Sequence, residues 1–116
     1  MTLDNFRNEM RGKREHIDQE ARLEKDSQSA LDLLYEMYRA FSEQERVLAH
    51  QVLNEWLMSE DENLRFDALA IIDEFKIADT EPALNALTDR LVASNMPSSP
   101  YELAKVRRIL HALKLP

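Results

Sequence analysis

The feature that most constrains this fold is the spacing of its apolar residues, which recur every three or four positions along most of the chain. This spacing places apolar side chains on one face of an α-helix. Six segments show the pattern, and the whole sequence contains one glycine and four prolines. Because the tight turns of β-sandwiches and barrels need many such residues, the sequence predicts an all-α protein with about six helices.

The first predicted helix covers about residues 3–25, and the second begins at Ser27 or Ser29. Within the first helix, residues 11–16 contain no apolar side chain and include Gly12, the only glycine. Glycine in a helix interior is destabilising because it loses more conformational freedom on folding than other residues. We therefore expect this helix either to be loosely packed or to break near Gly12.

Helix-starting signals mark the next four predicted helices. Ser42 and Glu45 form a capping box, in which each side chain accepts a hydrogen bond from a backbone N–H group that would otherwise be free. Asp61 is a candidate N-cap for the fourth helix, and Pro82 lies in the first turn of the fifth, where no backbone donor is needed. The sequence Ser-Pro-Tyr-Glu at 99–102 predicts a second capping box for the sixth helix.

The connections between these helices are short, about two to six residues, so neighbouring helices should lie antiparallel. A chain of 116 residues is expected to form one domain. We predict a single α-helical domain over residues 1–116. Its parts are a loosely packed N-terminal helix in 1–26 and a helical-repeat core in 27–116.

A weak internal repeat lies in residues 42–114. Leu53 and Leu57 recur as Leu87 and Leu91, at an offset of 34 residues. This period is in the range of helical solenoid repeats, in which stacked helix pairs bury a shared core. The offset therefore indicates two copies of one helix-pair unit.

One segment carries a family resemblance. Asp61 is followed by the pair Leu64-Arg65 and then by Ala68-Leu69. This arrangement resembles the start of the second helix of a HEAT repeat. The resemblance implies a short stack of antiparallel helix pairs, a HEAT-like α-α superhelix. It also implies a binding role, since proteins of this family act mostly as scaffolds without catalytic residues.

The residues that support catalysis or metal binding are scarce. With no cysteine and one glycine, the chain lacks thiol nucleophiles and glycine-rich phosphate loops. The histidines, at positions 16, 50 and 111, lie in separate segments without the spacing of helical metal sites. We expect His16 and Glu20 to form a surface pair, and His50 to be hydrogen-bonded at the border of the core. The predictions are no enzyme, no cofactor and no metal.

The net charge of −7 is unevenly distributed along the chain. Residues 26–94 carry fifteen acids and five bases, a net charge of −10, whereas residues 95–116 carry one acid and four bases, a net charge of +3. An acidic surface repels phosphate backbones and attracts basic proteins, so nucleic-acid binding is not expected. A small basic cluster lies in the last helix: Lys105, Arg107, Arg108, His111 and Lys114.

The start of the chain, residues 1–7, shows no long apolar stretch behind charged residues of the kind that signal peptides have. No apolar run approaches the length of a membrane span. Together with the lack of cysteine, these features predict a cytoplasmic protein that does not bind membranes.

The predicted fourth helix contains the candidate binding residues. On a helical wheel, Phe66 and Asp73 lie opposite the apolar stripe of this helix. An aromatic ring surrounded by carboxylates is typical of an interface with a basic protein. The candidate partner-binding residues are Glu62, Phe66, Asp67, Asp73 and Glu74. The alternative is that Phe66 and Leu69 pack against a neighbouring helix pair.

Two functional hypotheses follow. The first is an acidic immunity or inhibitor protein that neutralises a basic partner, such as a secreted nuclease toxin. The second is a structural adaptor or subunit of a larger assembly, which would use an exposed apolar patch containing Tyr35, Phe66 and Leu69. Salt should weaken binding by the inhibitor but not by the adaptor. The sequence leaves the partner's identity and the oligomeric state open.

Overall fold

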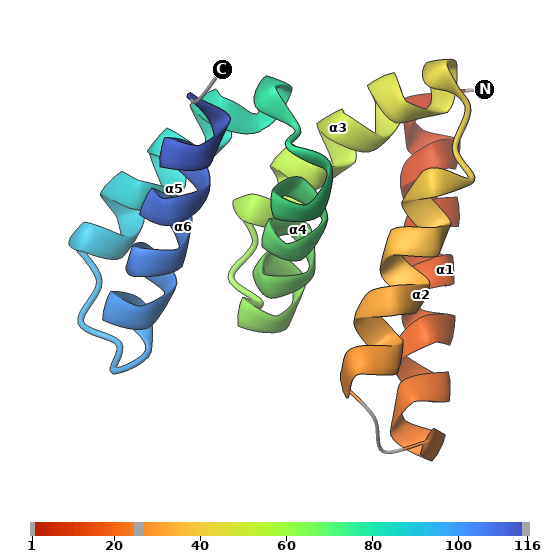
Figure 1. The fold of residues 1–116 in the computed structure, drawn as a ribbon, viewed down its shortest axis with the longest axis horizontal. Coiled ribbons are helices and arrows are strands. Elements are labelled where there is room, and N and C mark those ends of the chain that lie inside the picture. The colour runs from red at the N-terminus through yellow and green to blue at the C-terminus, as the bar shows by residue number, and fades with distance from the viewer. Residues whose placement is uncertain (1, 25–26, 115–116) are drawn as a thin grey trace. The chain divides into compact units, whose positions relative to one another are not determined.

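The structure is a computed structural model that describes residues 2–24 and 27–114. These residues form six α-helices and one short 3-10 helix and contain no strand, which confirms the predicted all-α fold (Figure 1). The helices are α1 (Leu3–Glu24), α2 (Ser27–Arg39), α3 (Glu43–Leu57), α4 (Glu62–Phe75), the 3-10 helix η1 (Ala78–Thr80), α5 (Glu81–Val92) and α6 (Ser99–Leu113). The six α-helices pack in pairs.

The chain divides into two compact units, residues 1–52 and 53–116, and α3 begins in the first unit and ends in the second. Each unit has its own set of buried apolar side chains. The prediction that the whole chain forms one domain stays a prediction.

The first unit is built on the packing of α1 against α2. Phe6 and Met10 of α1 are fully buried. The ring of Phe6 meets that of Phe41 edge-on, with 5.1 Å between the centroids, and Tyr38 meets Phe41 in the same way at 6.2 Å. Edge-to-face rings at these distances add to the stabilisation that burial provides.

Helix α1 runs without interruption through Gly12, so the predicted break at this residue is wrong. The residues around Gly12 are exposed, and a Cβ atom added there would meet no other atom within 4 Å. The gap in the apolar pattern is therefore a solvent-facing stretch of a continuous helix. Two expectations for α1, its end at Lys25 and the packing of Leu23, lie outside the described residues and side chains.

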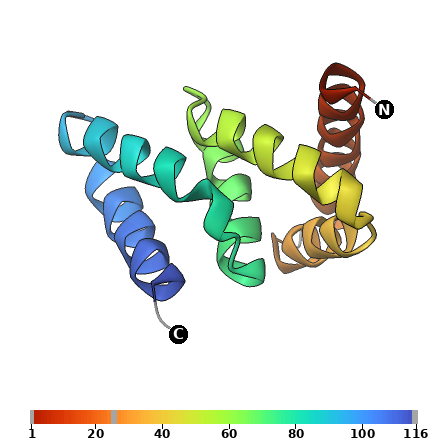
Figure 2. The same ribbon diagram turned by 90° about the horizontal axis from the view of Figure 1, so that it is seen from above.

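The second unit contains the C-terminal end of α3 together with α4, η1, α5 and α6. Helices α5 and α6 pack against each other in opposite directions, and α6 also contacts α4, alongside which it runs in the same direction (Figures 1 and 2). Trp56 is buried. All four leucines of the internal repeat are buried as well: Leu53, Leu57, Leu87 and Leu91.

One predicted capping box is present and the other is absent. The backbone N–H of Ser42 donates to Glu45 at 2.9 Å, and that of Glu45 donates to the Ser42 hydroxyl at 3.1 Å, which confirms the first. The second is wrong: Ser99 is buried inside α6, where its hydroxyl donates to Ser94 at 2.7 Å. Glu102 does not cap α6, because its carboxylate pairs with Arg65 of α4 instead.

Candidate functional site

The site begins at the turn before α4. Asp61 caps this helix, as predicted, by accepting hydrogen bonds from the backbone N–H groups of Asn63 at 2.9 Å and Leu64 at 3.4 Å. The carboxylates of Glu60, Asp61 and Glu62 follow one another here, and all three residues are exposed. We call these three residues the acidic turn. It concentrates negative charge at one end of the second unit.

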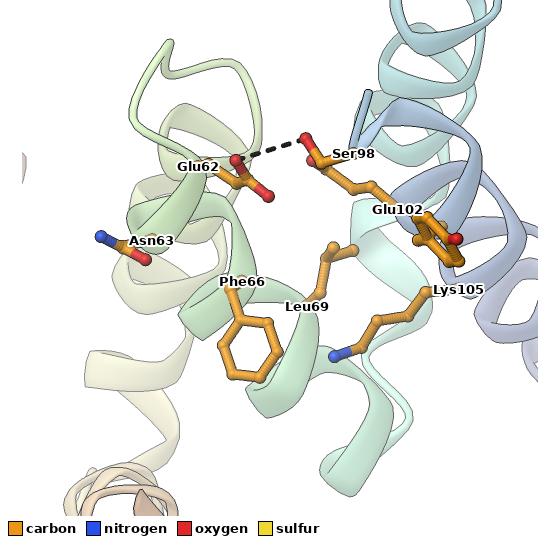
Figure 3. A pocket seen from close by; sticks show the side chains of 8 residues that line it. Glu62, Asn63, Phe66, Leu69, Ser98, Glu102 and Lys105 are labelled. Atoms are coloured by element: carbon orange, nitrogen blue, oxygen red, sulfur yellow. Dashed lines mark hydrogen bonds between the residues drawn. The ribbon is translucent and has the colours of Figure 1, made fainter. Parts of the chain in front are cut away.

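A pocket of about 240 Å³ lies beside the acidic turn, between α4 and α6 (Figure 3). Its lining residues are Glu62, Asn63, Phe66, Leu69, Ser98, Tyr101, Glu102 and Lys105. Leu69 is buried, whereas Phe66 remains 46% exposed and Tyr101 82% exposed. The pocket, called the α4–α6 pocket below, therefore offers two accessible aromatic rings next to carboxylates.

Behind the pocket, an ion pair joins the two helices. The Nε and Nη2 atoms of Arg65 donate to the two carboxylate oxygens of Glu102 at 2.7 and 2.9 Å, and its Nη1 donates to the carbonyl of Ser59 at 2.9 Å. The side chains of Arg65 and Glu102 are largely buried, with exposed fractions of 12% and 10%. The hydrogen bonds that Arg65 donates to Glu102 raise the pKa of Arg65, although burial opposes the change. Glu102 is thus neutralised within the protein and is not free to attract a ligand.

Lys105 of α6 reaches across the pocket to α4, and its ammonium lies 3.9 Å from the centroid of the Phe66 ring (Figure 3). This is a cation–π contact, in which the electron-rich ring face attracts a positive charge. Burial lowers the pKa of Lys105, and the nearby charge of Arg108 lowers it further. Among the described residues, Lys105 makes no ion pair or hydrogen bond through its ammonium.

Further along α4, Asp73 is engaged by two bases. Its carboxylate accepts hydrogen bonds from Lys76 at 3.2 Å and from Arg108 of α6 at 3.3 Å. Burial alone would raise the pKa of Asp73, but the hydrogen bond from Lys76 and the charge of Arg108 outweigh it and lower the pKa. Two members of the basic cluster of the last helix, Lys105 and Arg108, therefore contact α4.

The structure separates the five predicted site residues. Glu62 and Phe66 line the α4–α6 pocket, whereas Asp73 lies in the ion-paired cluster just described. Asp67 is half-buried and Glu74 is exposed, and neither lines this pocket. Only part of the surface predicted on α4 is therefore gathered into one place.

The alternative interpretation of α4 is that Phe66 and Leu69 pack against a neighbouring helix pair. The burial of these residues agrees with it for Leu69 but not for Phe66. Leu69 is buried, as expected for packing against a neighbouring helix pair, and is therefore not part of an exposed apolar patch. Ala70, which lies on the face opposite the core stripe, is buried as well. Helix α6 contacts α4, and Leu69 lines the pocket between the two helices.

Five residues of the pocket were not identified from the sequence: Asn63, Ser98, Tyr101, Glu102 and Lys105. The sequence places Tyr101 only at the start of a helix and Lys105 only in a basic cluster. An aromatic residue beside a proline in the first turn of a helix was a usable signal, because side chains of the first turn often remain exposed.

A second pocket, of about 340 Å³, adjoins the first and shares Glu62 and Ser98 with it. It also contains Glu60 of the acidic turn and Met96, which is 65% exposed. Met58, 43% exposed, is tied to this region because its carbonyl accepts a hydrogen bond from Arg90 at 2.8 Å. Exposed apolar residues thus continue from the α4–α6 pocket along the acidic turn.

The predicted pair of His16 with Glu20 and the predicted hydrogen bonding of His50 are both present. His16 lies 3.0 Å from Glu20 on the surface of α1, and the ring of His50 lies 2.7 Å from the hydroxyl of Tyr38 at the border of the core. Within the described ranges, no three acidic or histidine side chains gather as metal ligands. None of the helices of the described chain has the length and apolarity needed to cross a bilayer.

Comparisons with known protein families, with curated proteins and with solved structures each found no match to this chain. A function for it therefore rests on the geometry and charge of its own residues.

Proposed function

We propose that this chain is a non-enzymatic protein-binding module, and most specifically an acidic immunity or inhibitor protein that neutralises a basic partner such as a nuclease toxin. The observation that carries the proposal is the juxtaposition of exposed Phe66 and Tyr101 with the acidic turn. Binding energy at protein interfaces concentrates in aromatic anchors set in partly enclosed surfaces. Carboxylates around such anchors favour a basic partner.

The charge distribution supports the same partner. Residues 26–94, which include the acidic turn, carry a net charge of −10 from fifteen acids and five bases. A strong field of one sign accelerates the encounter with a protein of opposite charge. A faster association rate benefits an inhibitor, because it must reach its target quickly. The proposal includes a cytoplasmic location, which the lack of cysteine fits.

A HEAT-like repeat is part of the proposal. The leucines at the offset of 34 residues are all buried in the second unit, and the pair Ala68-Leu69, which carries part of the resemblance, is buried as well. Stacked helix pairs of this kind expose extended surfaces for partners. The repeat accounts for architecture, and the specificity comes from the α4–α6 pocket.

A structural adaptor is the second candidate. The exposure of Tyr101 and Met96 favours it, since contacts made mainly by apolar surface do not need opposite charges. The adaptor surface would then be centred on these two residues and Phe66 rather than on Leu69, which is buried.

The test is affinity capture with the immobilised full chain from an extract of the source cells, followed by mass spectrometry. The double variant Phe66→Ala/Asp67→Lys serves as the comparison bait. We expect the wild type to retain a basic protein that the variant loses, while circular dichroism of the variant stays unchanged. Equal retention by both baits would contradict the assigned surface, and retention of an acidic or neutral protein would favour the adaptor.

A matched control is available on the other unit. Val47→Ala/Glu43→Lys makes the same two kinds of change at exposed positions of α3 in the first unit. This variant should retain the partner as well as the wild type does. Its loss of the partner would indicate a response to net charge alone.

A further inference from the structure

The α4–α6 pocket already contains a positive charge supplied by the protein itself. The Lys105 ammonium lies over the face of the Phe66 ring at 3.9 Å from its centroid. A ring that holds one cation at this distance has the accessible face and the surroundings that another cation needs. The pocket is therefore suited in shape and electrostatics to a cationic group.

Lys105 is weakly held in this position. Phe66 and Leu69 make part of its surroundings apolar, and burial and the charge of Arg108 lower its pKa more than the charges of Asp73 and Glu102 raise it. Among the described residues no carboxylate pairs with its ammonium. Displacement into water would restore the hydration of the ammonium, so the loss of one cation–π contact is partly offset.

Glu62 supplies the counter-charge at the mouth of the pocket. It is exposed, and its carboxylate accepts one hydrogen bond, from the Ser98 hydroxyl at 3.4 Å (Figure 3). This distance is long for a bond between a hydroxyl and a carboxylate, so the contact is weak. The Glu62 carboxylate is thus open to a stronger donor.

We propose that the α4–α6 pocket receives an arginine side chain of the protein partner, which stacks on Phe66, pairs with Glu62 and displaces Lys105. The inference rests on the proposed function and names the group that the basic partner presents. A guanidinium fits better than an ammonium, because it is planar, stacks on aromatic faces and donates two parallel hydrogen bonds to a carboxylate. An anionic ligand is disfavoured, since the carboxylates of Glu62 and Glu102 line the pocket, and the neighbouring cations Arg65 and Arg108 are already paired with carboxylates of the protein.

The test uses the full chain labelled with ¹⁵N and a capped glycine–serine peptide with one central arginine. Two matched peptides carry citrulline, which is the neutral isostere of arginine, or glutamate at the same position. We expect the arginine peptide to shift the backbone amide signals of the pocket residues, with an affinity of roughly millimolar order for a single side chain. The citrulline and glutamate peptides should bind at least about tenfold more weakly.

Substitutions in the protein separate the roles of Lys105, Glu62 and Phe66. Lys105→Ala should tighten binding of the arginine peptide by about threefold or more, because it removes both the competitor and a like charge. Arg107→Ala is the matched control: it makes the same change of charge on α6 at an exposed residue that does not line this pocket. Its effect should be clearly smaller. Glu62→Gln and Phe66→Leu should each weaken binding.

Three outcomes would overturn the proposal. They are equal binding of the citrulline peptide, loss of binding in Lys105→Ala, and absence of any pocket shift at the highest soluble peptide concentration. These failures differ from a failure of the proposed function. If the captured partner is lost by Phe66→Ala/Asp67→Lys but is indifferent to Glu62→Gln and Lys105→Ala, the binding module stands and the arginine occupant is wrong. If no basic protein is captured, the module proposal fails whatever the peptide does.

Discussion

Arg65 shows how much a single side chain contributes to the junction of α4 with α6. It donates to both oxygens of Glu102 and to the carbonyl of Ser59, so one guanidinium links two helices and the turn before α4. Bidentate charge-assisted hydrogen bonds are among the strongest that a protein forms. The α4–α6 pocket depends on this link, because its two walls are the helices that the ion pair joins.

The first prediction concerns the loss of this link. Glu102→Ala leaves the largely buried guanidinium of Arg65 without its carboxylate, and we expect the free energy of unfolding to fall by about 2 kcal/mol or more. Urea denaturation followed by circular dichroism measures the change. The comparison is Arg108→Ala, which removes a more exposed pair with Asp73 and should cost less than about 1 kcal/mol. If the free energy of unfolding fell equally in the two variants, the buried ion pair of Arg65 would not contribute more than the exposed pair of Arg108.

The second prediction concerns pH and Asp73. Its pKa lies below the ordinary value of 3.8, because Lys76 and Arg108 stabilise the carboxylate more than burial destabilises it. A carboxyl group whose pKa is lower in the folded state binds protons more tightly when unfolded. Its stabilisation is therefore complete above the unfolded pKa and is lost as the pH falls through the folded pKa.

We accordingly expect the melting temperature to fall as the pH drops below about 4, with Asp73→Asn making this fall smaller. Thermal unfolding followed by circular dichroism across the acidic range measures it. Arg108→Ala should also reduce the fall, because it removes one of the two bases that lower the pKa. An unchanged pH profile in both variants would show that Asp73 does not contribute.

At the level of elements, only one of the two Ser-x-x-Glu motifs forms a capping box. Ser42 and Glu45 form the capping box that their spacing predicts, because both partners lie in the same helix turn. In the second motif Glu102 has a stronger partner in Arg65, and Ser99 is one residue inside the helix. A local motif thus describes the structure only where no distant residue competes for the same side chain.

The third prediction belongs to helix α1. Gly12 lies in the middle of an unbroken helix, and an added Cβ atom would meet nothing within 4 Å. Gly12→Ala should therefore raise the free energy of unfolding by about 0.5–1 kcal/mol, since alanine loses less conformational entropy on folding. Chemical denaturation measures this gain. A loss of stability would mean that α1 needs the freedom of glycine at this point.

At the scale of the whole molecule, charge is unevenly distributed along the chain. Net negative charge is concentrated in residues 26–94, whereas residues 95–116 carry a net charge of +3. Part of that positive charge is engaged within the second unit, through Arg108 with Asp73 and Lys105 with Phe66. The carboxylates of the acidic turn are exposed, so under the proposed function this turn is where a basic partner would approach the second unit.

The fourth prediction follows from this distribution. The association rate with the captured partner should fall by about tenfold or more between low and physiological salt, because screening removes the steering field. Surface plasmon resonance at several salt concentrations measures the rate. Lowering the charge of the acidic turn with Glu60→Gln should reduce the salt dependence. A rate indifferent to salt would favour the adaptor.

The sequence by itself determined the helices, most of their starting points and the stripes that they bury. Each of these features depends on residues within one or two turns of each other, so periodicity and capping patterns are sufficient to predict them. The same periodicity identified Glu62 and Phe66 as surface candidates, because a helical wheel shows which face of a helix each residue lies on. It placed His50 correctly, at the border of the core, for the same reason.

Only the tertiary structure decided what faces α4. The contact of Lys105 with Phe66 and the pairing of Glu102 with Arg65 join residues of different helices, the latter 37 positions apart, and no local pattern specifies such partners. The burial of Leu69 and the exposure of Tyr101 follow from the way α6 lies along α4. The pocket exists because two helices meet, and long-range packing rather than helix propensity determines which side chains line it.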